Sequence, residues 1–78
     1  MATRFRLTPT AEGSKALRVA LASQGINARV AKQDRAYRVV SEDARTLSAL
    51  VALGFEGPLG GQPVRTNPTQ FVAYEFAA

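Results

Sequence analysis

The stretch that decides the fold is Ala36–Phe55, AYRVVSEDARTLSALVALGF, which predicts a strand running directly into an amphipathic helix. Tyr37 and Val39 alternate with Arg38, and this period-two pattern is typical of a half-buried strand. Ser41 stands where a helix N-cap is expected, and two carboxylates follow it in the first turn, where the helix dipole favours negative charge. Three- and four-residue spacing then predicts the buried face of the helix: Ala44, Leu47, Leu50 and Val51.

An earlier part of the chain repeats this plan. The alternation of Arg and apolar residues predicts a first strand over Thr3–Thr8, and a helix follows, capped by Thr8 or Thr10 and ending near Gln24. Its expected inward residues are Ala16, Leu17, Ala20 and Leu21. Phe5-Arg6-Leu7 matches Tyr37-Arg38-Val39, and Gly25-Ile26 matches Gly54-Phe55, where each glycine can adopt the left-handed conformation that ends a helix.

Two further strands complete the expected sheet. Ile26–Lys32, with Ile26, Ala28 and Val30 inward, should form a hairpin with the strand at Ala36. The last strand, Gln70–Phe76, can bury either Phe71, Ala73 and Glu75 or Val72, Tyr74 and Phe76. The first choice buries a carboxylate with no evident partner, which is costly, so we expect the second.

This order of elements predicts an α+β fold of the ferredoxin-like split βαβ type, β-α-β-β-α-β, within one small domain over residues 1–78. The four-stranded antiparallel sheet should have the order 4-1-3-2, with both helices on one face and the other face open. The segment 54–68 is long for a connection and rich in Gly and Pro. It is either a floppy linker, a functional loop, or a short extra edge strand near residues 62–65.

The amino-acid composition limits the classes of function that this protein could have. The 78 residues contain no Cys and no His, so thiolate chemistry and the commonest general base and metal ligand are absent. We therefore expect no enzyme, no catalytic residue, no cofactor and no metal. There is no apolar run of about 18 residues and no signal-peptide pattern, which predicts a cytoplasmic protein that does not enter membranes. The net charge of +4 favours acidic partners, although a GC-rich bacterial or phage genome would also enrich Ala and Arg.

Two surfaces are candidate binding sites. The open sheet face should carry four arginines with one aromatic residue beside them: Arg4, Arg6, Arg29, Arg38 and Phe71. In the expected topology Arg6 and Arg38 are neighbours, and adjacent like charges favour an anionic group from a partner. The segment 54–68 should add two apolar contacts and a charge: Leu59, Val64 and Arg65.

These surfaces predict a small non-catalytic interaction protein of adaptor or inhibitor type, which docks on a protein or nucleoprotein assembly with an acidic surface. The alternative is a nucleic-acid-binding domain that uses the basic sheet face. RNA-binding domains of similar topology stack bases on central-strand aromatics, but the equivalent positions here are Arg6, Ala36, Arg38 and Val40. Only Phe71 could stack. A homodimer formed through the same face is a further expectation.

Overall fold

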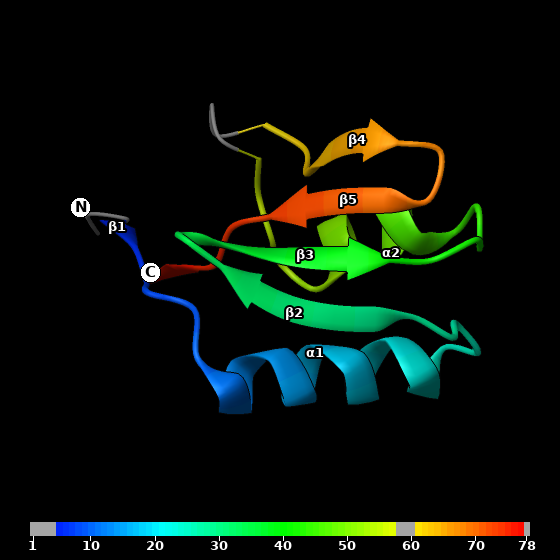
Figure 1. Ribbon diagram of the computed structural model, residues 1–78, viewed down its shortest axis with the longest axis horizontal. Helices are drawn as coiled ribbons and strands as arrows, with labels where there is room; N and C mark the ends of the chain where they lie inside the picture. The colour runs from blue at the N-terminus through cyan, green and yellow to red at the C-terminus, as the bar shows by residue number, and fades with distance from the viewer. Residues whose placement is uncertain (1–4, 58–60, 78) are drawn as a thin grey trace.

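The structure is a computed structural model that describes residues 5–57 and 61–77. Its elements are β1 (Phe5–Arg6), α1 (Ala11–Ser23), β2 (Arg29–Gln33), β3 (Ala36–Val40), α2 (Thr46–Ala52), β4 (Val64–Asn67), β5 (Gln70–Ala73) and β6 (Phe76–Ala77) (Figure 1). Four of the strands form an antiparallel sheet in the order β2-β3-β5-β4, and β1 pairs separately with β6. The fold is α+β with two helices and a four-stranded antiparallel sheet, as expected.

The ferredoxin-like topology and its strand order 4-1-3-2 are wrong. The main sheet follows α-β-β-α-β-β order, and the place beside β3 that was expected for the first strand belongs to β5. The strand β1 has two residues and is soon followed by Pro9, which cannot donate a ladder hydrogen bond. In contrast, β4 and β5 are joined by a tight turn, and closing so short a loop costs little entropy. The expected edge strand therefore exists, at 64–67 rather than 62–65.

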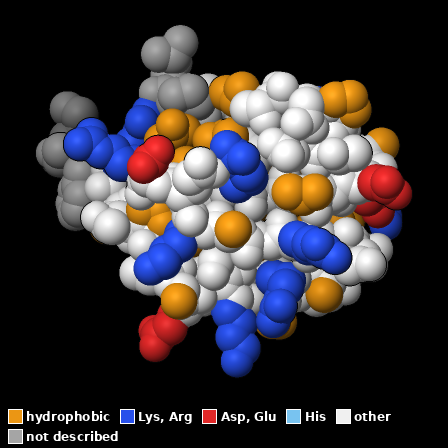
Figure 2. Space-filling model, viewed as in Figure 1, with side chains coloured by type: hydrophobic (Ala, Val, Ile, Leu, Met, Phe, Trp, Pro, Cys, Tyr) orange, Lys and Arg blue, Asp and Glu red, His pale blue; other side chains and the backbone are white. Residues whose placement is uncertain are grey.

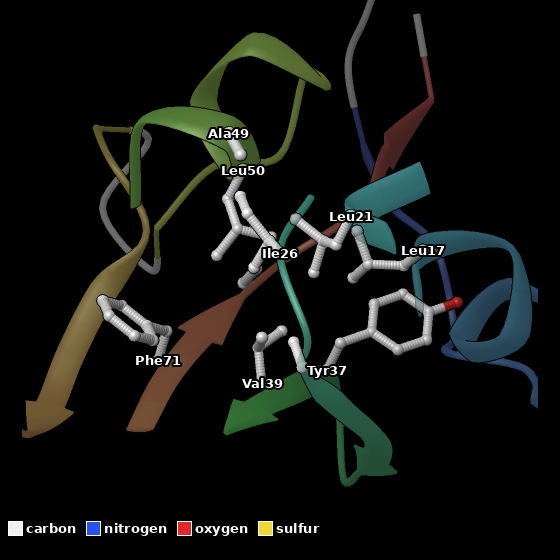
Figure 3. Close-up of a cluster of buried hydrophobic side chains, with 10 residues drawn as sticks. Leu17, Leu21, Ile26, Tyr37, Val39, Ala49, Leu50 and Phe71 are labelled. Carbon is white, nitrogen blue, oxygen red and sulfur yellow. The ribbon is translucent and has the colours of Figure 1, made fainter. Parts of the chain in front are cut away.

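Both helices contribute to one core, which lies against a single face of the sheet (Figure 3). The core contains Leu17, Leu21, Ile26, Ala28, Tyr37, Val39, Ala49, Leu50, Phe71 and Ala73. The predicted inward positions of β3 and of the segment before β2 are confirmed, since Tyr37, Val39 and Ile26 are almost fully buried. Viewed as in Figure 1, α2 lies behind the sheet, so the face turned toward the reader is the one that the helices leave open.

The two helices end in the same way, and the predicted match of Gly25-Ile26 with Gly54-Phe55 is confirmed there. Both glycines have positive φ, +79° and +91°. The N–H of Ile26 donates to the carbonyl of Leu21, and the N–H of Phe55 donates in the same way to that of Leu50. Each bond spans six residues, and each glycine N–H closes the shorter inner turn, which is the Schellman motif. The repeated structural unit is thus a helix followed by a hairpin.

The start of α1 is held by a hydroxyl from the sheet. Thr10, the alternative of the two expected caps, is the N-cap, and its side chain accepts a hydrogen bond from the N–H of Gly13. The N–H of Thr10 donates to the Tyr37 hydroxyl at 3.2 Å, and that hydroxyl donates to Glu75 at 3.0 Å. A Cβ on Gly13 would overlap the Tyr37 hydroxyl, so a glycine that weakens the helix is what lets Tyr37 fill the core.

The expected start of the second helix at Ser41 is wrong. The helix begins at Thr46, because the segment before it forms its own hydrogen-bonded turn. The Ser41 side chain is buried, accepts from the N–H of Asp43 at 3.1 Å, and lies 2.7 Å from the Thr46 hydroxyl. The buried face consists of Thr46, Ala49 and Leu50, whereas Ala44 and Val51 are exposed. Two of the four predicted inward positions are confirmed, since Leu50 is fully buried and Leu47 packs against the core, and Thr46 and Ala49 face inward in place of the other two.

The expected register of the last strand is also wrong. Phe71 and Ala73 point into the core with 4% and 0% exposure, while Val72 and Tyr74 lie on the other side of the sheet. The strand β5 ends at Ala73, so Glu75 follows it instead of continuing its alternation. Glu75 also has a partner, the Tyr37 hydroxyl. The cost assigned to a buried, unpartnered carboxylate therefore does not arise.

The segment 54–68 is partly structural. Glu56 bridges to Tyr74 through paired backbone hydrogen bonds of 3.0 and 2.8 Å, and the N–H of Gly57 donates to the carbonyl of Gly61 at 2.8 Å. Gly57 and Pro63 are buried, and β4 then pairs with β5 with a bulge between Arg65 and Asn67. Leu59 lies outside the described residues. The proposed role of this segment in binding stays a prediction.

Candidate binding site

The open face of the sheet is defined by the strand registers. Tyr37 and Val39 point to the core, so Arg38 between them points to the opposite side. In the sheet Arg38 lies between Ala31 of β2 and Val72 of β5. The same alternation places further residues on this face: Arg29, Gln33, Ala36, Val40, Val64 and Gln70. The expected positions of Arg29 and Arg38 on the open face are confirmed.

The charge of the sheet has one sign. The four strands of the main sheet, all within the described residues, contain no Asp or Glu, and they place two arginines on the open face, Arg29 and Arg38. Figure 2 shows the open face, with Lys and Arg side chains scattered across it and acidic side chains near its margins. Because the paired strands supply no carboxylate, the field over this face is positive.

Arg6 reaches this face from outside the sheet. It belongs to β1, and its guanidinium carbon lies 4.1 Å from the centre of the Tyr74 ring and 5.5 Å from that of Phe76. Such contacts between a cation and an aromatic face are attractive and fix the guanidinium in place. The expected pairing of Arg6 and Arg38 on adjacent strands is therefore wrong, although the two residues still line the same hollow.

This hollow is a concave part of the open face. It has a volume of about 600 Å³ and lies where the β2–β3 turn approaches the β1–β6 ribbon. Its lining is Arg6, Gln33, Asp34, Arg35, Ala36, Tyr37, Arg38, Val72 and Tyr74. The lining therefore combines three arginines and one carboxylate with small apolar side chains. We call this hollow the arginine hollow.

A second hollow of about 530 Å³ lies toward the other end of β2 and is lined by Gly25, Asn27, Arg29, Val40, Ser41, Glu42 and Asp43. Next to it, Arg45 hydrogen-bonds the Asp43 carboxylate through both its backbone N–H and its side chain, and the closest ion-pair distance is 2.7 Å. The side-chain bond from Arg45 is the main cause that lowers the pKa of Asp43 from 3.8 to about 2. Asp43 is paired with Arg45, and Glu42 and Arg29 carry opposite charges, so this hollow is close to neutral.

Several predicted site residues do not belong to the open face. Phe71 is in the core, and Arg65 covers its ring from the helix side, with the guanidinium carbon 5.7 Å from the ring centre. The expected place of Phe71 on the open face, where it could have stacked on a base, is therefore wrong. Val64 is 40% exposed and pairs with Val72, so it extends the open face at the β4 edge. Arg4 and Leu59 lie outside the described residues.

Of the residues that line the arginine hollow, only Arg6 and Arg38 were predicted as site residues, and the polar and aromatic ones that were missed include Gln33, Arg35 and Tyr74. The first two belong to the β2–β3 hairpin, and the expected turn at 33–35 was a signal that their side chains would be accessible. Tyr74 was placed in the core by the wrong register. The correct register could have been found by asking which group partners Glu75. Tyr37 was already expected to face inward, and its hydroxyl is that partner.

The helix side carries a separate apolar surface. The exposed face of α1 forms a shallow groove lined by Glu12, Lys15, Ala16, Val19, Ala20 and Ser23, and Val19 is 56% exposed. Within the described residues, no group of three or more acidic side chains could hold a metal ion, and neither helix is long and apolar enough to cross a membrane.

Comparisons with protein-family models, with curated proteins and with solved structures gave no match for this chain, so its function has to be inferred from its own residues.

Proposed function

We propose that this protein is a non-catalytic binding module that docks its open sheet face on the acidic surface of a protein or nucleoprotein assembly. One observation carries the proposal: Arg6, Arg35 and Arg38 converge on one hollow of a face whose strands contain no carboxylate. Arginine presents a planar fork of donors that matches carboxylate and phosphate groups.

An anionic partner would also stabilise the open face energetically. Like charges gathered on one sheet face repel, and an anionic group placed between them would remove that repulsion. Val64 adds an exposed apolar side chain at the β4 edge of the same face. Arg65 supports the edge rather than the face, because it packs on Phe71 and donates to the carbonyls of Asn67 and Pro68.

Charge reversal on the two sides of the molecule tests this proposal. Arg29→Glu combined with Arg38→Glu alters the open face, and Lys15→Glu combined with Arg18→Glu makes the same change of charge on exposed positions of α1. Binding of each labelled variant to polyglutamate and to mixed-sequence oligonucleotides is measured by fluorescence anisotropy. We expect the open-face variant to lose binding and the α1 variant to keep it. The opposite pattern would show that the wrong face has been chosen.

Direct binding of nucleic acid is a second candidate, favoured by Tyr74 and Gln33 beside the arginines of the hollow. Salt dependence separates the two candidates. Binding to a single strand should weaken with a slope of about −0.7 in log K against log salt for each phosphate neutralised. A shallow slope together with nuclease-resistant capture of a protein partner would favour a protein surface.

A further inference from the structure

We infer that the arginine hollow binds one nucleotide of a single-stranded nucleic acid, with its phosphate among the arginines and its base on the apolar floor. This inference rests on the proposed function, because it requires the basic open face to be the binding surface. The inference goes beyond the proposed function by naming the ligand, a nucleotide, that binds in the hollow at one end of the open face.

The size and floor of the hollow fit a flat, partly apolar ligand. A volume of about 600 Å³ lies inside the range of about 300–1,000 Å³ typical of small-molecule sites. Ala36 and Val72 come from the adjacent strands β3 and β5 and line the hollow with small side chains, Ala36 being 8% exposed and Val72 half-buried. The carboxylate of an acidic peptide would gain nothing from such a surface, whereas a base would cover it.

The wall offers a stacking surface. The guanidinium carbon of Arg6 lies over the Tyr74 ring, 4.1 Å from its centre, so a guanidinium and an aromatic ring stand together beside the floor. Single-stranded bases stack on aromatic rings and on guanidinium planes alike. The observed register brings Tyr74 to this side of the sheet and sends Phe71 to the core, so the open face has an aromatic residue after all.

The polar groups of the hollow match the rest of a nucleotide. Arg35 and Arg38, from the β2–β3 turn and from β3, supply cationic donors for a phosphate. Gln33 has both a donor and an acceptor for a base edge. Asp34 lies in the same lining and repels any anion, but it can accept from a sugar hydroxyl or a base amino group, which an acidic side chain does not offer. This combination favours nucleic acid over an acidic peptide.

The inference is tested by fluorescence anisotropy with a labelled, mixed-sequence RNA of about ten nucleotides, the matching DNA, and a duplex of the same sequence. We expect both single strands to bind more tightly than the duplex, because only an unpaired base can enter the hollow. Arg38→Gln should reduce the salt slope by about 0.7, the contribution of one phosphate contact to a single strand. Lys15→Gln, on the opposite side of the protein, is the matched control and should leave the slope unchanged.

A variant that fills the hollow without changing its charge separates the contribution of base stacking to binding from that of the arginine charges. Ala36→Leu should weaken single-strand binding by about 5- to 100-fold with an unchanged salt slope, since the loss of one stacked base has that magnitude. Circular dichroism checks that it folds. Gln33→Ala, at an exposed position, is the second variant and should weaken binding to the single strands more than to the duplex.

The outcomes distinguish this inference from the proposed function. Equal affinity for single strand and duplex, with no effect of Ala36→Leu or Gln33→Ala, would overturn the nucleotide site. Polyglutamate binding that depends on Arg38, without oligonucleotide binding, would also overturn it while leaving the proposed function standing. If neither polymer binds, both fail.

Discussion

Gly13→Ala should destabilise this protein, although alanine is the better helix former. In an exposed helix the exchange would stabilise by up to about 1 kcal/mol. Here the new Cβ would overlap the Tyr37 hydroxyl and come within 3.0 Å of both the Tyr37 ring carbon Cζ and the Thr10 hydroxyl. The Tyr37 ring is fully buried, so it cannot move aside without disturbing the core.

The expected size of the effect follows from these contacts. Overpacking a core costs about 1–3 kcal/mol. Displacing the Tyr37 hydroxyl would also break its bonds to the N–H of Thr10 and to Glu75, at about 1–3 kcal/mol for groups left unsatisfied. After the gain of about 1 kcal/mol in helix propensity, we expect a net loss of about 1–5 kcal/mol in the free energy of unfolding. In a domain of this size each kcal/mol lowers the melting temperature by about 4–8 °C.

Thermal and urea unfolding followed by circular dichroism measure this loss, and a double-mutant cycle with Tyr37→Phe assigns its cause. Without the hydroxyl, Gly13→Ala should cost at least about 1 kcal/mol less, and the remaining cost would reflect the ring carbon at 3.0 Å. Val19→Ala, on the exposed side of α1, is the control and should change stability by no more than about 0.5 kcal/mol. A Gly13→Ala protein as stable as the parent, or an equal cost in both backgrounds, would refute the reasoning.

Three further predictions concern the core, the acid stability and the segment after α2. Leu50→Ala should cost about 2–5 kcal/mol in the free energy of unfolding, because Leu50 is fully buried; a variant that melts like the parent would show that α2 packs differently. Asp43→Asn should flatten the acid side of the stability profile. Because the pKa of Asp43 is lowered from 3.8 to about 2, its ionised carboxylate stabilises the parent fully above pH 3.8, and this stability is lost as the pH falls through about 2. If parent and variant lose stability equally in urea melts at acid pH, the prediction is wrong. Gly57→Ala should lower the melting temperature, because the new Cβ would overlap the carbonyl oxygen of Gln62. Gly61→Ala is the matched control, since a Cβ there has open space around it. Equal melting temperatures of the two variants would contradict the close approach of Gly57 to Gln62.

Features that depend on neighbouring residues could be predicted from the sequence. The ends of both helices follow from Gly25 and Gly54, whose positive φ and hydrogen bonds involve only the preceding turn. The inward positions of Tyr37 and Val39 follow from their alternation with Arg38, and the basic character of the face follows from where arginine stands in that alternation. The presence of an edge strand before Gln70 was also recognisable from its turn residues.

The arrangement of these pieces was decided by contacts between distant parts of the chain. The two-residue strand β1 pairs with β6 instead of joining the main sheet. Its alternating sequence therefore predicted a strand but not the strand's neighbour. The register of the last strand depended on whether Glu75 had a partner, and its partner is Tyr37, separated from it by 38 positions. This contact removed the cost that had placed Phe71 outside and Tyr74 inside. The sequence by itself therefore determined that two helices form and where they end, the hairpin, and the basic character of the open face. Which strands are neighbours, and which aromatic residue stands beside the arginines, was decided by the tertiary structure, because the free energy of burying a charge depends on the partner that folding brings to it.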